Sequence, residues 1–368
     1  MKLNIPGNIK GITPYPPGKP LDELEREYGI TGSIKLASNE NPWGPSPKAM
    51  TAIQESLSDL HRYPDGSSYY LTLALSEWTG AAPEEIVLGN GSNELIEFMV
   101  KTFVRSGDEV ITSHPSFLMY QKFVQVRGGT NIVINLRNMR HDLESISSAV
   151  TEQTRLIFLD NPNNPCATLI SKEHFADFLT TLPENLIVVL DEAYVDFVEP
   201  AKRIDVLELI RHPEGIPAVV GLRTFSKAFG LSGLRVGFGI MHPDISSLLH
   251  RVRQPFNINQ LGQIGALAAL DDQAHYDRTI NDTRKGLIWL SEQVRALGCV
   301  PYPSCTNFFL IDVRGDATRL YEAMLHKGVI IRSMKAYGYP DFIRITIGTE
   351  NENKRFINSL KECLQELT

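Results

Sequence analysis

The chain has 368 residues, of which 42% are hydrophobic and 21% charged, a composition typical of a globular protein with a sizeable core. Its net charge of -7 argues against a partner with a phosphate backbone, so we expect no binding to nucleic acid. The length exceeds the usual size of one domain and suggests two, at about 150 residues per domain.

The sequence also argues against a membrane and a metal site. It has no apolar run approaching the ~18 residues that span a bilayer and no signal peptide at its N-terminus, so we expect a cytoplasmic protein. Its cysteines form no Cys-x-x-Cys pair and no metal-ligand spacing with histidine, which predicts reduced thiols and no metal. The cysteines are Cys166, Cys299, Cys305 and Cys363.

The first 35 residues are rich in proline and glycine, and we expect an extended arm with one helical segment at 21–28. From about residue 45 to 265, short apolar segments alternate with helical patterns, which is typical of a parallel sheet with helices on both faces. The expected strands are 86–89, 109–112, 131–135, 155–160, 186–190, 218–222 and 235–240.

The pattern changes after about residue 275, where helices and strands no longer alternate in this way. We therefore predict an α/β protein with an N-terminal arm (1–35), a large domain with a mostly parallel sheet (36–270) and a smaller α+β domain (271–368). In the last part we expect a helix at 276–297, a strand at 307–312, a helix near 317–327, strands at 329–331 and 342–347, and a helix from 352.

Polar segments follow several predicted strands, at the edge of the sheet where ligands bind in such folds. The strand 86–89 leads into Asn90-Gly-Ser-Asn-Glu94, where a Gly-Ser pair at a helix start presents backbone N–H groups to an anion. The strand 155–160 ends in Asn161-Pro-Asn-Asn-Pro165, which is also an Asn-Pro turn.

Asp191-Glu-Ala-Tyr194 follows the apolar residues 186–190, which we expect to form a strand buried on both faces. A carboxylate fixed at this point can hold a pyridine nitrogen in its protonated form, so that the ring accepts electrons. A helix N-cap is the commoner role for a single aspartate in this setting.

The segment Arg223-Thr-Phe-Ser-Lys-Ala-Phe-Gly-Leu-Ser-Gly-Leu-Arg235 follows another apolar strand. A lysine on a loop that leaves a buried strand can be desolvated, which lowers its pKa and frees the amine of Lys227 to form a Schiff base with an aldehyde. Hydroxyl and guanidinium groups of Thr224, Ser226 and Arg235 suit a phosphate. Aldehyde and phosphate together indicate pyridoxal 5'-phosphate (PLP), although a lysine taken alone is more often a surface charge.

Taken in order, Gly-Ser-Asn-Glu, Asn-Pro-Asn-Asn-Pro, Asp-Glu-Ala-Tyr, Ser-Lys and Gly-Leu-Arg resemble the PLP-dependent aminotransferases of fold type I, and the resemblance covers nearly the whole chain. It implies that the arm joins the smaller domain. The flanking segments are similar to one family among these enzymes, the histidinol-phosphate aminotransferases. Those segments are Ile12-Thr-Pro-Tyr-Pro-Pro17, Leu36-Ala-Ser-Asn-Glu-Asn-Pro-Trp-Gly44, Arg62-Tyr-Pro-Asp65, Ile330-Ile-Arg-Ser-Met334 and Ile343-Arg-Ile-Thr-Ile-Gly-Thr349.

The resemblance implies a role for each matching residue. Lys227 would carry the cofactor and move the proton between the substrate's Cα and the cofactor's C4'. Asp191 would hold the pyridine nitrogen, while Tyr194 and Asn164 would hydrogen-bond the phenolic oxygen of the ring. The residues expected to bind the phosphate are Ser92, Asn93, Thr224, Ser226 and Arg235.

Two aromatic residues complete the expected cofactor site. Phe117 matches the residue that stacks on the ring, an interaction worth about 0.5–1.5 kcal/mol beyond buried area, so it orients more than it catalyses. Tyr63 resembles a tyrosine that reaches the cofactor phosphate of the neighbouring subunit, which implies a homodimer with shared active sites. From the residues alone, a turn tyrosine before Pro64 explains Tyr63 equally well.

Four residues are expected to bind the substrates. Arg344 resembles the arginine that grips the α-carboxylate of glutamate. Histidinol phosphate carries a larger anion in its place, for which Arg332 and Tyr15 would add donors; otherwise Arg332 would be a surface cation. Asn39 would be a further contact.

The loop after Asn164 departs from the family pattern. The family usually continues with Pro-Thr-Gly, whereas this chain has Pro165-Cys-Ala-Thr168 and lacks a glycine that could adopt a positive φ. This puts the loop geometry in question more than the chemistry, and it would place Cys166 near the cofactor.

The implied reaction is transamination of L-histidinol phosphate with 2-oxoglutarate to imidazole-acetol phosphate and L-glutamate, in histidine biosynthesis. Threonine-phosphate decarboxylase and aromatic amino-acid aminotransferase are alternatives with the same cofactor, and residues 343–349 with Tyr15 favour the first reading. A PLP-fold regulator without catalysis is a different class of function. The presence of Lys227, Asp191 and Arg235 weighs against it.

Overall fold

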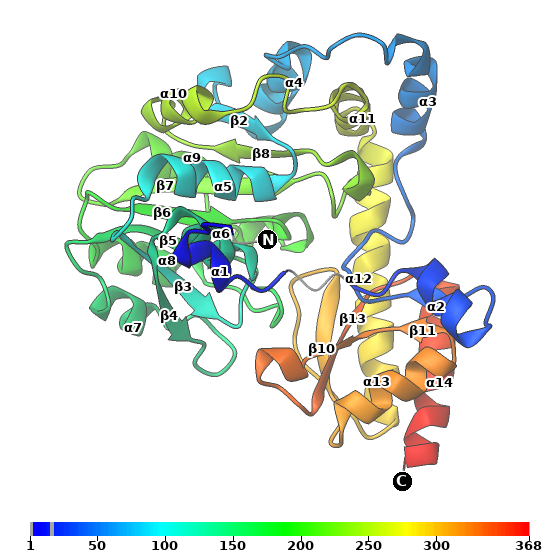
Figure 1. The fold of residues 1–368 in the computed structure, drawn as a ribbon. Helices are drawn as coiled ribbons and strands as arrows, with labels where there is room; N and C mark the ends of the chain where they lie inside the picture. Colours follow the sequence, from blue (N-terminus) through cyan, green and yellow to red (C-terminus); the bar gives the residue numbers. More distant parts are fainter. Residues whose placement is uncertain (1–2, 15–17, 368) are drawn as a thin grey trace.

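The computed structural model describes residues 3–14 and 18–367, and its centre is a seven-stranded sheet (Figure 1). The strand order is β2-β8-β7-β6-β5-β3-β4, and neighbouring strands run parallel except where β8 pairs with β2 and β7. The predicted mostly parallel sheet is confirmed. Its strands are β2 (Ile86–Gly89), β3 (Glu109–His114), β4 (Thr130–Asn135), β5 (Thr154–Asp160), β6 (Ile187–Asp191), β7 (Ala218–Thr224) and β8 (Gly237–Ile240).

Helices cover both faces of this sheet, so the alternate residues of its inner strands are buried on opposite sides. Ile157 and Leu159 of β5 belong to one apolar cluster, whereas Leu156 and Phe158 belong to the other. The second face is covered by α5 (Ser92–Phe103), α6 (Met119–Arg127) and α10 (Pro243–Val252). The first face is covered by α4 (Tyr69–Thr79), α7 (Leu143–Ser148), α8 (Lys172–Thr180), α9 (Val206–Arg211) and α11 (Gln260–Leu270), with α3 (Pro47–Glu55) packed on α11.

A second, antiparallel sheet lies in the C-terminal part of the chain, with the order β12-β13-β10-β9. The long helix α12 (Gln273–Ala296) runs from the large sheet to this smaller one (Figure 1). The elements are β9 (Val300–Pro301), β10 (Phe308–Asp312), α13 (Ala317–His326), β11 (Val329–Ile330), β12 (Arg332–Ser333), β13 (Phe342–Thr346) and α14 (Glu350–Leu367).

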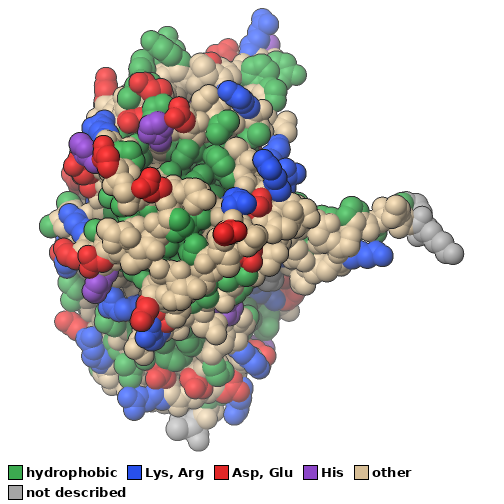
Figure 2. Space-filling view, turned by 90° about the vertical axis from the view of Figure 1, so that its left-hand side faces the viewer, with side chains coloured by type: hydrophobic (Ala, Val, Ile, Leu, Met, Phe, Trp, Pro, Cys, Tyr) green, Lys and Arg blue, Asp and Glu red, His purple; other side chains and the backbone are tan. Residues whose placement is uncertain are grey.

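The N-terminal arm packs on both parts of the molecule. Leu24 of α2 (Leu21–Tyr28) is buried against Leu325 and Ile330, and β1 (Ile34–Lys35) pairs with β11. The short helix α1 (Gly7–Lys10) instead contacts α6, and Figure 2 shows the N-terminal segment projecting from the side of the molecule. The domain boundaries at residues 35 and 270 stay a prediction.

One predicted strand begins in the wrong place. We expected a strand from residue 235, but Arg235 has a left-handed backbone (φ 57°) after a short 3-10 helix, Ser232–Leu234, and β8 begins at Gly237. This turn brings the guanidinium back to Ser226, which an extended strand would not do. No helix within residues 3–14 and 18–367 is long and apolar enough to cross a bilayer.

Candidate active site

The carboxyl ends of β5, β6 and β7 open into a cavity of about 290 Å³, which β12 and β13 of the smaller sheet help to line. The structure brings most of the predicted site residues together here. Those that line the cavity are Asn39, Ser92, Asn93, Phe117, Asn164, Asp191, Tyr194, Thr224, Ser226, Lys227, Arg235, Arg332 and Arg344.

Two predicted residues are not in this cavity. Tyr63 is 82% exposed and stacks on Phe256 with 4.9 Å between the ring centroids, so it does not reach the cavity of its own chain. Tyr15 lies outside the described residues.

Lys227 follows β7, and its partly buried side chain lines the cavity. Its Nζ donates a hydrogen bond to the backbone oxygen of Ser38 at 3.3 Å and lies 5.6 Å from the ring centroid of Tyr194. Burial, and then the positive charge of Arg344, lower the pKa of Lys227 to about 8. A substantial fraction of the amine is therefore neutral near physiological pH and can act as a nucleophile.

Asp191 is the last residue of β6, and its carboxylate is buried. One carboxylate oxygen accepts from the hydroxyl of Tyr120 at 2.8 Å, and the other accepts from the backbone N–H of Ala193 at 3.1 Å. Burial raises the pKa of Asp191 to about 7. A cation such as a protonated pyridine nitrogen would stabilise the carboxylate, so the site fits that part of PLP.

The hydroxyl of Tyr194 accepts hydrogen bonds from the side-chain amides of Asn39 at 2.9 Å and Asn164 at 3.4 Å. Burial raises the pKa of Tyr194 to about 12, although the charge of Arg344 acts in the opposite direction. The hydroxyl therefore stays protonated and can donate its own hydrogen to an oxygen in the cavity.

Hydroxyls and a guanidinium meet at the other end of the cavity. Thr224 Oγ1 lies 3.0 Å from Ser226 Oγ, and Nη1 of Arg235 donates to Ser226 Oγ at 3.3 Å. Arg235 also donates to the backbone oxygen of Ser232 at 2.9 Å, which orients its side chain. This donor set matches the charge and geometry of a phosphate.

The start of α5 adds backbone donors to this end of the cavity, because Ser92 and Asn93 are its first two residues. Gly91 precedes them with φ 73°, a conformation that favours glycine, and a Cβ there would also lie 2.5 Å from Nη2 of Arg235 and displace its guanidinium. The side-chain oxygen of Asn93 is buried with no hydrogen-bond partner among the described residues. The backbone N–H groups at the start of α5 and the guanidinium of Arg235 are donors that suit a phosphate, and the residues present therefore fit PLP.

Arg344 and Arg332 form the wall contributed by the smaller sheet. Arg344 donates to the side-chain oxygen of Asn164 and, at 2.9 Å, to the backbone oxygen of Ala37. Its guanidinium also lies 5.1 Å from the ring centroid of Phe308. Arg332 is its cross-strand partner, so two cations face one cavity that can hold an anion.

The loop after Asn164 keeps its turn despite the departure from the family pattern. Ala167 adopts φ 59°, the conformation that a glycine would favour, and its methyl group packs with Tyr194 and Phe308. Contrary to our expectation, Cys166 does not line the cavity, because its side chain packs with Leu310 and Met334. Burial raises the pKa of this thiol to about 12, which makes it a poor nucleophile.

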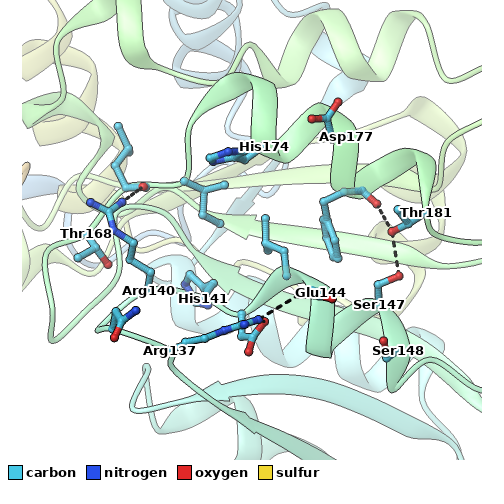
Figure 3. A pocket seen from close by; sticks show the side chains of 16 residues that line it. Arg137, Arg140, His141, Glu144, Ser147, Ser148, Thr168, His174, Asp177 and Thr181 are labelled. Atoms are coloured by element: carbon cyan, nitrogen blue, oxygen red, sulfur yellow. Dashed lines mark hydrogen bonds and ion pairs between the residues drawn. The ribbon is translucent and has the colours of Figure 1, made fainter.

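Sequence reasoning missed several residues of the site. Tyr120 contacts Asp191 from α6 and packs edge-on against the ring of Phe117, and its position three residues after Phe117 was the available signal. Ser116 and Asp160 also line the cavity, but nothing in the sequence linked them to it. A larger hollow of about 650 Å³ between α7 and α8 holds none of the predicted residues (Figure 3).

The family model for aminotransferase class I and II matches residues 31–360, and the chain belongs to this family. It is 63% identical over 367 residues to the histidinol-phosphate aminotransferase of Desulfotalea psychrophila, covering 100% of this chain and 97% of the relative. It is 43% identical to the histidinol-phosphate aminotransferase of Moorella thermoacetica, over 97% and 92% of the two chains. The crystal structure of the Sinorhizobium meliloti histidinol-phosphate aminotransferase with pyridoxal-5'-phosphate is similar, with a TM-score of 0.91, 27% identity and coverage of 100% and 99%.

Proposed function

We propose that this chain is a PLP-dependent aminotransferase that transfers the amino group of L-histidinol phosphate to 2-oxoglutarate, giving imidazole-acetol phosphate and L-glutamate in histidine biosynthesis. The observation that carries the substrate assignment is the pair Arg332 and Arg344 in one cavity, because a phosphate dianion can be held by two cations. Relatives at 63% and 43% identity that bear the histidinol-phosphate name support it.

The alternatives have less support. The L-threonine-O-3-phosphate decarboxylase of Porphyromonas gingivalis is 22% identical with a TM-score of 0.78, which shows a shared fold alone. An aromatic amino acid carries one carboxylate and would leave Arg332 without an anion. A regulator without catalysis would not need a buried lysine of lowered pKa beside a buried carboxylate.

When bound, PLP supplies a protonated ring that stabilises negative charge at the substrate's Cα. Asp191 would hold the pyridine nitrogen in its protonated form, supported by the hydroxyl of Tyr120. Lys227 would take the proton from Cα with its neutral amine and return it at C4', because it lies on a short, buried loop next to Tyr194.

The other residues would bind and orient. Thr224, Ser226 and Arg235, with Ser92 and Asn93 at the start of α5, would hold the cofactor phosphate. Phe117 would stack on the ring, while Tyr194 and Asn164 would hydrogen-bond its phenolic oxygen. Arg344 would bind the α-carboxylate of glutamate or, together with Arg332, the phosphate of histidinol phosphate, and Asn39 would orient Tyr194.

We further propose a homodimer in which Tyr63 of one subunit reaches the cofactor phosphate of the other. Tyr63 is exposed in its own chain, and the neighbouring elements carry other exposed apolar side chains, a pattern typical of a protein interface. The N-terminal segment that projects in Figure 2 adds exposed Leu3, Ile5 and Ile9. The exposed residues near Tyr63 are Met50, Leu57, Leu60, Tyr69, Tyr70 and Phe256.

We expect such a biosynthetic enzyme in the cytoplasm.

The reaction is tested by incubating the purified holoenzyme with 2-oxoglutarate and one amino donor at a time: histidinol phosphate, phenylalanine or threonine phosphate. Mass spectrometry would then identify the products. We expect glutamate and imidazole-acetol phosphate in equal amounts, with a kcat/KM highest for histidinol phosphate. Release of carbon dioxide from threonine phosphate, or a preference for phenylalanine, would contradict the proposal.

A further inference from the structure

His141 is a buried histidine that none of the roles above uses. It precedes α7 and helps to line the hollow of Figure 3. On its other side the ring faces Asp160, the residue before the loop 161–165. Nε2 lies 3.0 Å from the backbone oxygen and 3.2 Å from Oδ1 of Asp160, and Nδ1 lies 2.7 Å from Ser113 Oγ. Since both atoms of Asp160 are acceptors, Nε2 carries a proton, and the hydroxyl of Ser113 holds the ring from the side of Nδ1.

Asp160 connects this histidine to the catalytic cavity. It is the last residue of β5 and the cross-strand partner of Asp191. Its Oδ2 accepts from the backbone N–H of Asn164 at 2.7 Å, and its Oδ1 accepts from Ser116 Oγ at 2.8 Å and Asn163 Nδ2 at 3.0 Å. One carboxylate therefore fixes both the Asn164 loop and the residue that precedes Phe117.

We propose that His141 and Asp160 form a positioning pair that holds Asn164 and the Ser116–Phe117 segment in the geometry that the catalytic cavity requires. The inference deepens the proposed function and rests on it for the meaning of the kinetics. His141 lies outside the catalytic cavity, whereas Asp160 lines it. The pair acts through Asn164, which contacts Arg344 and Tyr194, and through Phe117.

The burial of Asp160 explains why a second donor matters. Its side chain is only 5% exposed, so its oxygens depend on the donors of His141, Ser116, Asn163 and Asn164 rather than on water. Loss of the Nε2 donor would remove one hydrogen bond from the backbone oxygen and one from Oδ1, which would keep only Ser116 and Asn163, and this favours rotation of the buried carboxylate. A rotated carboxylate would release the backbone of Asn164 or the hydroxyl of Ser116.

Two amide substitutions separate this role from simple packing. His141→Gln can place a donor where Nε2 lies, whereas His141→Asn can reach only the position of Nδ1 and loses the contact with Asp160. We expect His141→Asn to lower kcat by roughly 10- to 100-fold, because small misplacements of catalytic groups have effects of this size. His141→Gln should stay within a few-fold of the wild-type enzyme, and so should the control His174→Gln, since His174 lines the same hollow without contacting Asp160.

The cofactor provides a second measurement, independent of the substrate. In His141→Asn we expect weaker binding of PLP and a shifted midpoint in the pH titration of the absorbance of bound PLP, because Asn164 and Tyr194 are displaced. His141→Gln should restore the affinity and the midpoint.

If His141→Asn does not fold, Ser113→Ala frees the ring of His141 from its other side and should show the same changes at smaller size. Wild-type kcat and PLP affinity in every variant, or equal losses of them in His141→Gln and His141→Asn, would contradict the positioning role of His141 and Asp160. An inactive wild-type enzyme on histidinol phosphate would instead contradict the proposed function, and the PLP measurements would still test the pair.

Discussion

Arg332 and Arg344 lie directly opposite one another on the antiparallel strands β12 and β13, and both line the cavity that holds Lys227. Like charges in this position repel each other, so the arrangement is unfavourable until an anion lies between them. Arg344 has contacts with Asn164 and Ala37 that orient it in the absence of substrate. The pair therefore indicates a site that is selective for anions, and we propose that its second cation distinguishes a phosphate from a carboxylate.

Lys227 should form its bond with PLP faster as the pH rises through about 8, because burial lowers its pKa and only the neutral amine attacks an aldehyde. Stopped-flow absorbance of apoenzyme mixed with PLP at pH 6 to 10 measures this rate. Lys227→Ala should lose the absorbance of the covalently bound cofactor and several orders of magnitude in turnover. Turnover of Lys227→Ala near the wild-type rate would rule out its assigned role.

Asp191 should destabilise the apoenzyme at neutral and alkaline pH, because burial raises its pKa in the folded state to about 7, above the ordinary value of 3.8. The unfolded chain loses this proton more easily, so the penalty grows as the pH rises through the window between those values and is complete above it. Asp191→Asn apoenzyme should therefore unfold at a higher temperature than the wild type at pH 8, and the difference should shrink toward pH 4.

The same variant should bind PLP yet lose most of its turnover. Unchanged activity would leave Asp191 a purely structural role.

Tyr63 should act on the active site of the other subunit. Mixing inactive Tyr63→Ala and Lys227→Ala subunits should restore activity, because the heterodimer then contains one site with both native residues. Asp191→Asn mixed with Lys227→Ala is the matched control and should show no recovery, since both of these residues line the same cavity of one chain. Failure of the first mixture after subunit exchange has been demonstrated would argue against a shared site.

The large sheet and much of the cavity were predictable because their signals are local. Strands such as 186–190 are apolar at every position, which indicates burial on both faces. The polar residues that follow such parallel strands must then meet at one edge of the sheet. Lys227 and Asp191 could be placed in this way. Arg235 was placed in a strand because its left-handed turn depends on a contact with Ser226 that no local pattern shows.

The supporting residues were not predictable for a related reason. Tyr120 and His141 act through Asp191 and Asp160, which are distant from them in sequence, and each is an ordinary buried residue when considered alone. At Ala167, by contrast, the departure from the family pattern suggested a different loop geometry, yet the alanine adopts the positive φ that a glycine would favour. Packing of its methyl group against Tyr194 and Phe308 offsets part of the cost of its positive φ.

The most direct test of the account is single-turnover kinetics of both half-reactions on Arg332→Ala, with the exposed Arg319→Ala as a control. A hydrogen bond to a charged group contributes about 1.5–3 kcal/mol, so kcat/KM for histidinol phosphate should fall roughly 10- to 150-fold, while the glutamate half-reaction should lose much less because Arg344 binds its carboxylate. Arg319→Ala should leave both unchanged. Equal losses in the two half-reactions of Arg332→Ala would contradict a phosphate-reading role for Arg332, and with it the assignment of a phosphorylated substrate.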